Sequence, residues 1–158
     1  KNIDTLIKYH NEYIRRKNKN LRLVLTGGGE TVRGRNIIDL GYISRQDKYN
    51  AMSACEFLCQ PSLNESFSLV IMENWLCKRP VLVHGDCEVT KNFVSESNGG
   101  LYFRNYAEFE ACTDYLLNNV KISAGMGLNG MEYVKSHFTH EIVNRKYIEF
   151  FKEISNKN

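Results

Sequence analysis

The sequence lacks the features that mark membrane-spanning, exported and nucleic-acid-binding proteins. No apolar run approaches the ~18 consecutive residues of a membrane-spanning helix, and we expect no signal peptide. The formal net charge is only +3, which is too small for the strong basic stripe typical of nucleic-acid-binding proteins. Linkers, internal repeats and low-complexity stretches are also absent. We therefore expect one soluble, cytoplasmic domain over residues 1–158 and no nucleic-acid partner.

Cysteine is also irregularly placed. The five cysteines are an odd number, and none forms a CxxC pair. Cys55 and Cys59 lie four residues apart, but neither a histidine nor a second cysteine pair follows at a spacing that would complete a zinc site. This pattern predicts small buried thiols in a reducing compartment and no metal site.

What the chain has instead is an alternation of short apolar strands and amphipathic helices. Helices are expected at about 3–14, 44–54, 68–76, 89–94, 106–117, 122–135 and 140–154, and strands at 21–26, 36–40, 56–59, 81–83 and 101–103. Such alternation predicts an α/β domain in which helices cover both faces of a parallel sheet. Ligands of such sheets bind at the carboxyl ends of the strands, which here are residues 27–30, 41–44 and 61–68.

The two C-terminal helices differ in the strength of their patterns. Gly125, Gly127 and Gly130 weaken the expectation of a helix at 122–135. The last helix is expected to begin after Thr139, which is its predicted cap. One of its faces is apolar and consists of Val143, Tyr147, Phe150, Phe151 and Ile154. We expect both helices to pack at the edge of the sheet and the aromatic residues to lie in the core.

The densest basic run lies at the end of the first expected helix. It comprises Arg15, Arg16, Lys17, Lys19 and Arg22. Cations in the last turn of a helix complement the negative end of the helix dipole. We interpret the run as a solvated helix end in preference to a binding patch.

The segment from Pro61 to Glu73 combines two carboxylates with a helix start. It follows an expected strand, so the N–H groups near residues 67–69 would be free donors at the positive end of a helix dipole, a natural seat for a diphosphate. Glu65 precedes this seat, and Glu73 lies eight helical steps further on, a span of about 12 Å. The two carboxylates could accept hydrogen bonds from the sugar and ribose hydroxyls of one donor. A loop carboxylate and a surface helix residue would explain the same pair equally well.

This segment resembles the E-x7-E signature of the family 4 retaining glycosyltransferases, with Glu65 and Glu73 matching its two acids. The resemblance also includes residues 1–7, 23–29, 40–44, 80–83 and 98–99. It implies that the chain is the C-terminal, nucleotide-sugar-binding half of a GT-B enzyme, with a Rossmann-like parallel sheet covered by helices on both faces. The implied activity is retaining hexosyl transfer to a glycan or lipid-linked acceptor, in polysaccharide or glycoconjugate biosynthesis.

The resemblance also implies a role for each matching residue. Glu65 would be the catalytic residue that contacts hydroxyls of the transferred hexose, Glu73 would bind the ribose, and Lys1 would pair with the diphosphate. The 40–44 loop would pack the nucleobase. The implied donor-binding residues are Lys1, Gly28, Tyr42, Ile43, Ser66, Phe67, Ser68, Leu69 and Glu73.

The implied enzyme uses neither metal nor cofactor. No Asp-x-Asp motif occurs in the sequence, and fixed positive charge with N–H dipoles would neutralise the leaving diphosphate. The acceptor site would belong to an N-terminal domain upstream of Lys1, so we expect the 158-residue chain to be inactive alone. The implied full-length enzyme is compatible with a peripheral position at a membrane.

The chain departs from the family pattern at several glycines. Ser66 and Ser68 replace the glycines that follow the first acid, and Cys87 and Glu88 replace a Gly-Gly turn. The sequence does not name the base or the sugar of the donor. Two other functions use the same residues: a non-catalytic module for nucleotides or sugar phosphates, and a GT-B-type sugar-nucleotide epimerase.

Dinucleotide binding and serine hydrolysis are weaker interpretations. Glycines at 27–29 begin a turn, but Val32 stands where the dinucleotide fingerprint has its third glycine. Ser62 and Ser68 have no histidine and aspartate context for nucleophilic hydrolysis. His84, which ends a strand, is interpreted as a structural histidine.

Overall fold

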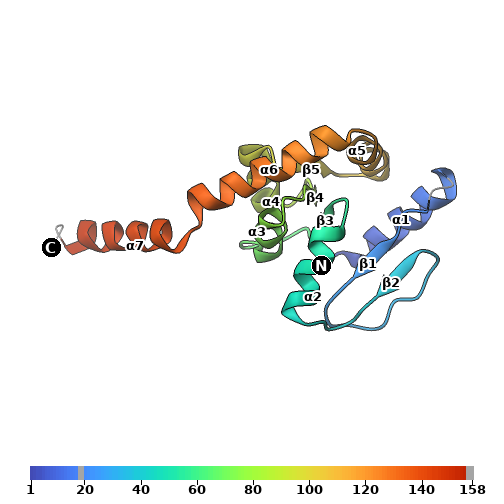
Figure 1. The fold of residues 1–158 in the computed structure, drawn as a ribbon, viewed down its shortest axis with the longest axis horizontal. Helices are drawn as coiled ribbons and strands as arrows, with labels where there is room; N and C mark the ends of the chain where they lie inside the picture. Colours follow the sequence, from blue (N-terminus) through green and yellow to red (C-terminus); the bar gives the residue numbers. More distant parts are fainter. Residues whose placement is uncertain (18–19, 156–158) are drawn as a thin grey trace.

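The computed structural model describes residues 1–17 and 20–155, so Lys19 of the basic run lies outside the described residues. Helices and strands alternate as expected (Figure 1). The helices are α1 (Ile3–Lys17), α2 (Arg45–Ala54), α3 (Leu69–Leu76), α4 (Glu88–Ser97), α5 (Tyr106–Asn118), α6 (Val120–His137) and α7 (His140–Ser155). The strands are β1 (Leu23–Leu25), β2 (Ile37–Asp39), β3 (Leu58–Gln60), β4 (Val81–His84) and β5 (Gly100–Phe103).

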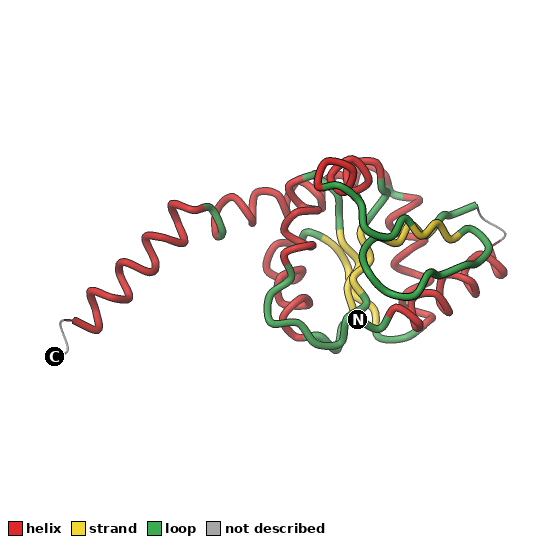
Figure 2. The backbone as a smooth tube through the Cα atoms, turned by 90° about the horizontal axis from the view of Figure 1, so that it is seen from below, coloured by secondary structure: helices red, strands yellow, loops and turns green. Residues whose placement is uncertain are grey.

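All strand pairings are parallel, which confirms the α/β class. β1 pairs with β2, and β4 lies between β3 and β5. The described strands therefore form a two-stranded and a three-stranded sheet, where we expected a single one (Figure 2). The two sheets share one hydrophobic cluster, against which both Leu23 of β1 and Cys59 of β3 pack.

The strand β4 lies at the centre of the core. All four of its residues are buried. Leu82 belongs to a cluster with residues of α1 and α5, whereas Val81 and Val83 belong to a cluster with residues of α3, α4 and α6. Because successive side chains of a strand point to opposite faces of the sheet, this division confirms that helices cover both faces.

The helix α6 packs closely because of the glycines that weakened its prediction. A Cβ atom at Gly127 would collide with the backbone carbonyl of Lys78, and one at Gly130 would collide with the ring of Trp75. Gly125 faces open space. Two of the three glycines therefore allow α6 to approach α3 and the turn that follows it.

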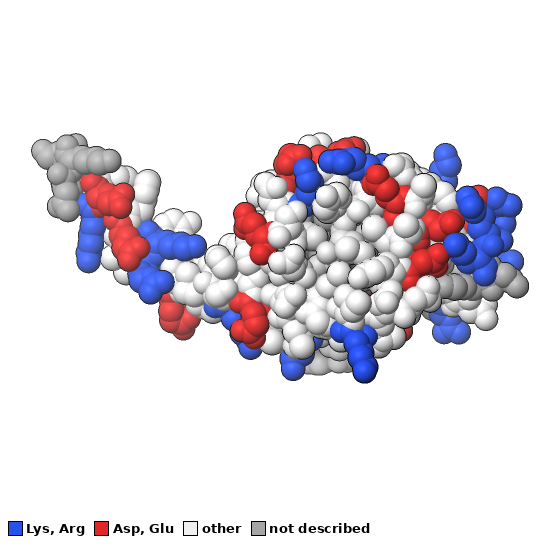
Figure 3. Space-filling view, turned by 90° about the horizontal axis from the view of Figure 1, so that it is seen from above, with Lys and Arg blue, Asp and Glu red and all other residues white. Residues whose placement is uncertain are grey.

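The helix α7 projects away from the rest of the molecule (Figures 1, 2 and 3). None of its residues is buried, and the side chains of Tyr147, Phe150 and Phe151 are 61%, 57% and 62% exposed. The helix and its amphipathic pattern are as predicted. The expectation that it packs at the sheet edge and that its aromatic residues lie in the core is wrong, because sequence periodicity indicates an apolar face without indicating what covers it.

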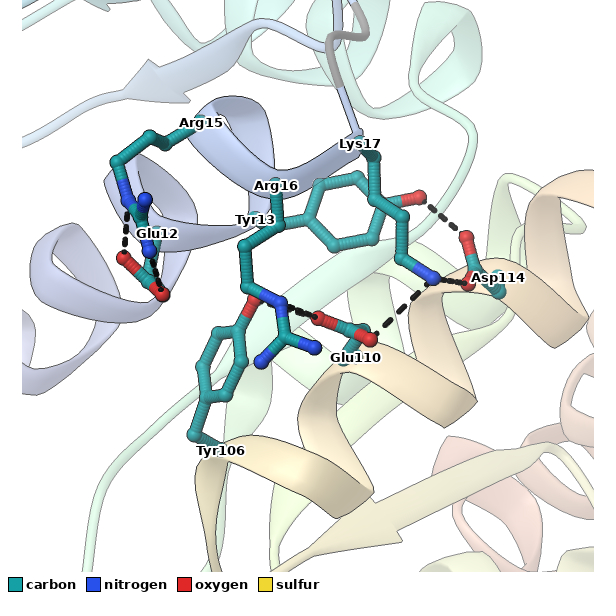
Figure 4. A network of polar contacts seen from close by, with 8 residues as sticks. All are labelled: Glu12, Tyr13, Arg15, Arg16, Lys17, Tyr106, Glu110 and Asp114. Atoms are coloured by element: carbon teal, nitrogen blue, oxygen red, sulfur yellow. Dashed lines mark hydrogen bonds and ion pairs between the residues drawn. The ribbon is translucent and has the colours of Figure 1, made fainter.

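The end of α1 is joined to α5 by a polar network (Figure 4). Lys17 Nζ lies 3.2 Å from Glu110 Oε1 and 2.8 Å from Asp114 Oδ2. Arg16 Nε lies 3.3 Å from Glu110 Oε2, and the buried Tyr13 donates a hydrogen bond to Asp114 at 2.7 Å. The start of the basic run lies in the last turn of α1, as predicted, but Arg16 and Lys17 have a second role there, because their ion pairs connect α1 to α5.

Candidate functional site

The connection between β3 and α3 contains the predicted phosphate seat. Helix α3 begins at Leu69 with Ser68 as its N-cap, and the Ser68 side chain makes no capping hydrogen bond to the helix. Its Oγ instead accepts a hydrogen bond from Gln60 Nε2 at 3.4 Å. The Leu69 side chain is 71% exposed, so the first turn of α3 lies at the surface. The first N–H groups of a helix have no partner one turn back within it. Ile71 N donates to Ser68 O at 3.2 Å, so among the described residues the N–H groups of Leu69 and Val70 remain donors for an anion.

The loop that carries this seat is anchored by one aromatic side chain. The ring of Phe67 packs edge-on against Phe93 and Phe138, with centroid distances of 5.4 and 5.2 Å. Ser66, one residue earlier, is exposed. The side chain of Phe67 is therefore engaged in the core, which leaves its backbone as the part available to a ligand.

Glu65 is held from two directions. Its Oε1 lies 2.6 Å from Lys1 Nζ and 3.1 Å from Gln60 Nε2. The Glu65 side chain is 13% exposed and that of Lys1 is 66% exposed. Partial burial acts to raise the pKa of Glu65, but the hydrogen bonds and charge supplied by Lys1, with a smaller contribution from Ser62, outweigh it and hold the pKa below its ordinary value. Glu65 is therefore a carboxylate at neutral pH.

Glu73 is engaged by the neighbouring helix α2. Lys48 Nζ lies 2.6 Å from Glu73 Oε1, and Tyr49 Oη donates to the same oxygen at 3.3 Å. The side chains of Lys48 and Glu73 are 33% and 25% exposed. Glu73 is thus more than an ordinary surface helix residue, because its carboxylate joins α3 to α2.

The glycine turn after β1 and the loop after β2, both at carboxyl ends of parallel strands, lie together. Gly27 N donates to Gly41 O at 2.8 Å, and a Cβ atom at Gly28 would collide with the ring of Tyr42. The Tyr42 side chain is 88% exposed, while Ile43 is half-buried. Gly41 has a φ of 58°, a conformation that favours glycine and turns the chain from β2 into the loop that exposes Tyr42.

Three residues of this region were missed by the sequence reasoning: Gln60, Lys48 and Tyr49. Gln60 carried a usable signal, because it is a polar residue at the end of a buried strand and is itself buried. Lys48 and Tyr49 lie in an ordinary polar helix 24 to 25 positions before Glu73. Nothing in their local pattern indicates that contact.

His84 and the replaced glycine turn are structural. His84 is buried against Phe103, with a centroid distance of 5.1 Å, and its Nδ1 accepts a hydrogen bond from Asp86 N at 3.2 Å. Cys87 is buried as the N-cap of α4. Glu88 lies in the first turn of α4 and pairs with Lys91 at 3.3 Å.

Two surface hollows lie away from the two glutamates. One, of about 680 Å³, follows the outer side of α1 next to Tyr106. The other, of about 460 Å³, lies between α4 and β5. None of the predicted donor-binding residues lines either hollow.

Metal binding and membrane crossing find no support among residues 1–17 and 20–155. No three histidine, cysteine, aspartate or glutamate side chains gather there as a metal ion would require, and metal independence stays a prediction. Over the same residues, every helix is too short or too polar to traverse a bilayer.

Several solved structures share this fold. Sucrose-phosphate synthase from Thermosynechococcus elongatus has a TM-score of 0.72 and 19% identity, with 87% of this chain and 39% of that chain covered. Anabaena Alr3699/HepE in complex with UDP has a TM-score of 0.72 and 18% identity, covering 84% and 41%. TarM has a TM-score of 0.80 and 20% identity, covering 94% and 32%. The chain therefore spans less than half the length of these proteins.

The family comparison agrees with the fold. No curated protein matches the chain. The family described as Glycosyl transferases group 1 matches residues 1–119, a range that includes both glutamates, Lys1, the glycine turn and the loop that exposes Tyr42. The chain therefore belongs to the group 1 glycosyl transferases and has the fold of the Rossmann-like C-terminal domain of a GT-B enzyme.

Proposed function

We propose that the chain binds a nucleoside diphosphate sugar at the β3–α3 connection and forms the donor half of a retaining glycosyltransferase. The observation that carries this proposal is the ion pair between Lys1 and Glu65, which Gln60 links to the N-cap of α3. This ion pair places an ammonium and a carboxylate near the first turn of α3. Family membership supports glycosyl transfer, and the similar HepE structures contain UDP or UDP-glucose.

The chemistry follows from what each group can donate or accept. The Lys1 ammonium has three N–H donors, so it can hold Glu65 and contact the diphosphate together. As the bond between sugar and phosphate breaks, negative charge grows on the diphosphate, and the ammonium and the first N–H groups of α3 stabilise it. Glu65 accepts hydrogen bonds from hydroxyls of the hexose and orients its anomeric carbon. Glu73 accepts from the ribose, and the exposed ring of Tyr42 is available to the base.

We extend this proposal to the whole enzyme. A hexose is transferred with retention to a glycan or a lipid-linked acceptor held by an N-terminal domain. The reaction needs no metal, because Lys1 and the helix start supply the positive charge. The enzyme works in the cytoplasm or at the periphery of a membrane, and the chain alone does not turn over.

A thermal-shift panel tests donor binding. The chain is melted with UDP, GDP, ADP and dTDP sugars, and we expect one base to raise the melting temperature, since a ligand at 100 times its Kd stabilises the native state by about 2.7 kcal/mol. Glu73→Ala should weaken binding of that donor. Glu65→Ala should leave nucleotide binding in place and abolish transfer by the full-length enzyme. Absence of any shift across the panel would contradict the proposal.

The position of the phosphate seat has its own test. Ser66→Asp adds a negative charge beside the first turn of α3, and should weaken the nucleoside diphosphate by about 1–3 kcal/mol while leaving the nucleoside nearly unchanged. Isothermal titration of both ligands measures the difference. Ser95→Asp, an exposed position on α4, controls for the added charge. If Ser66→Asp weakened both ligands equally, the diphosphate would not bind at the first turn of α3.

A further inference from the structure

The second signature acid is already engaged at one of its two oxygens. Lys48 Nζ at 2.6 Å and Tyr49 Oη at 3.3 Å both contact Glu73 Oε1. Within the described part of the chain, no donor contacts Glu73 Oε2. The carboxylate is thus fixed along one edge and open along the other.

The helix that supplies both contacts is itself firmly placed. Ser44 caps α2 by accepting a hydrogen bond from Asp47 N at 3.0 Å and donating one to Asp47 Oδ2 at 2.7 Å. The Lys48 ammonium also lies 5.2 Å from the centre of the Tyr49 ring, where a cation is attracted to the aromatic face. The helix α2 begins immediately after the loop that exposes Tyr42. Its contacts with Glu73 therefore connect that loop to the second acid.

We propose that Lys48 and Tyr49 are positioning residues, which orient Glu73 so that Oε2 faces the ribose hydroxyls and thereby set a preference for ribonucleotides over deoxyribonucleotides. This inference rests on the proposed function, because it requires Glu73 to bind the ribose of the donor. An ammonium and a phenol at Oε1 restrict the rotation of the carboxylate. A carboxylate held in one orientation loses more binding free energy when the ligand lacks the hydroxyl than does a carboxylate that can rotate and bond to water instead.

The alternative role for Lys48 is direct contact with the phosphates. That role would make every diphosphate bind more weakly when Lys48 is neutralised, whether or not the sugar carries a 2′-hydroxyl. Positioning through Glu73 affects only the ligands that carry the hydroxyl. The ratio of the two affinities therefore separates the roles.

The experiment is a titration of the 158-residue chain with the ribonucleoside diphosphate that binds best among UDP, GDP and ADP, and with its 2′-deoxy form. We expect the wild type to prefer the ribo form by about tenfold, the value of one hydrogen bond to a charged group. Lys48→Met should reduce that preference to about twofold, and Tyr49→Phe should reduce it less, because its hydrogen bond is neutral and longer. Lys48→Arg should retain most of it. Lys135→Met, which removes a cation on α6 paired with Glu132, should leave it unchanged.

Coupling to Glu73 completes the test. Glu73→Gln should lower the preference, and Lys48→Met added to it should lower it no further, because the two residues act through one carboxylate. The inference is overturned by an unchanged preference in Lys48→Met, or by equal weakening of both ligands. A wild-type chain that binds none of the three diphosphates would instead overturn the proposed function. Lys48→Arg and Tyr49→Phe keep the test decisive if Lys48→Met does not fold.

Discussion

The two sheets of the domain have the same parallel pairing but very different burial. Every residue of β4 in the three-stranded sheet is buried, whereas neither strand of the β1–β2 sheet has a buried residue. Val24 of β1 and Ile38 of β2 are 45% and 38% exposed, while Val81 and Val83 of β4 are at 0%. The stability of the core therefore resides mainly in the three-stranded half.

This difference divides the candidate site into two parts. Glu65 and Glu73 lie on the connection and the helix that follow β3, next to the deeply buried sheet. Tyr42 follows β2, in the half with few buried contacts. Regions with few buried apolar contacts open locally at lower free energy. We therefore expect the loop that exposes Tyr42 to adjust to the base more readily than the phosphate seat adjusts to the diphosphate.

The largest effect is expected in the three-stranded half at Trp75. Its side chain is fully buried, and Nε1 donates to Gly99 O at 2.9 Å. Trp75→Ala should lower the free energy of unfolding by about 3–5 kcal/mol, because it removes a large apolar side chain and leaves a cavity. Urea denaturation measures the loss. A cost below about 1 kcal/mol would show that this half does not hold the core together.

Two glycines of α6 test how closely this helix packs against Trp75. Gly130→Ala should destabilise the chain by about 1–3 kcal/mol, because its Cβ would collide with the Trp75 ring. Gly125→Ala is the matched control on the same helix, and should stabilise by about 0.5–1 kcal/mol, because it faces open space and alanine favours the helix. Both values come from denaturation curves. If the two variants changed stability alike, the close approach of α6 to Trp75 would be refuted.

The same substitution in both sheets tests the comparison directly. Val83→Thr places a hydroxyl in the fully buried strand and should cost about 1–3 kcal/mol. Val24→Thr places it on a half-exposed strand and should cost about 0.5 kcal/mol or less. Thermal and urea unfolding of the two variants are compared with the wild type. Equal costs would mean that the β1–β2 sheet is covered as deeply as the other.

The smallest effect on stability is expected at low pH, at the contact between His10 of α1 and the backbone of Leu21, just before β1. His10 of α1 is buried, with Nε2 3.1 Å from Leu21 O, and burial lowers its pKa from the ordinary 6.5. The unfolded chain then takes up a proton at a higher pH than the folded one, so stability should fall as pH drops below about 6.5. His10→Gln should flatten this dependence. Denaturation at pH 7.5 and 5.5 measures the change in the free energy of unfolding. The same change in the variant would show that His10 does not cause the pH dependence.

Much of the site could be predicted because its residues are close together in the sequence. The run from Pro61 to Glu73 contains the loop, the helix start and both acids, and the predicted boundary of α3 was within one residue of the observed one. The glycines of α6 show the limit of this approach. Their low helix propensity weakened the prediction of a helix, whereas the missing Cβ atoms of Gly127 and Gly130 let the helix approach Lys78 and Trp75.

The sequence by itself determined the order of the elements, the two faces of β4 and the placing of both glutamates after β3, because periodicity and spacing are local properties of the chain. Only the tertiary structure decided that Lys48 and Tyr49 contact Glu73, that Gln60 joins Glu65 to Ser68, and that α7 leaves the aromatic part of its apolar face exposed. These contacts join segments through space, and they depend on how the helices pack around the sheets. A local pattern states which side chains can interact, but packing determines which of them meet.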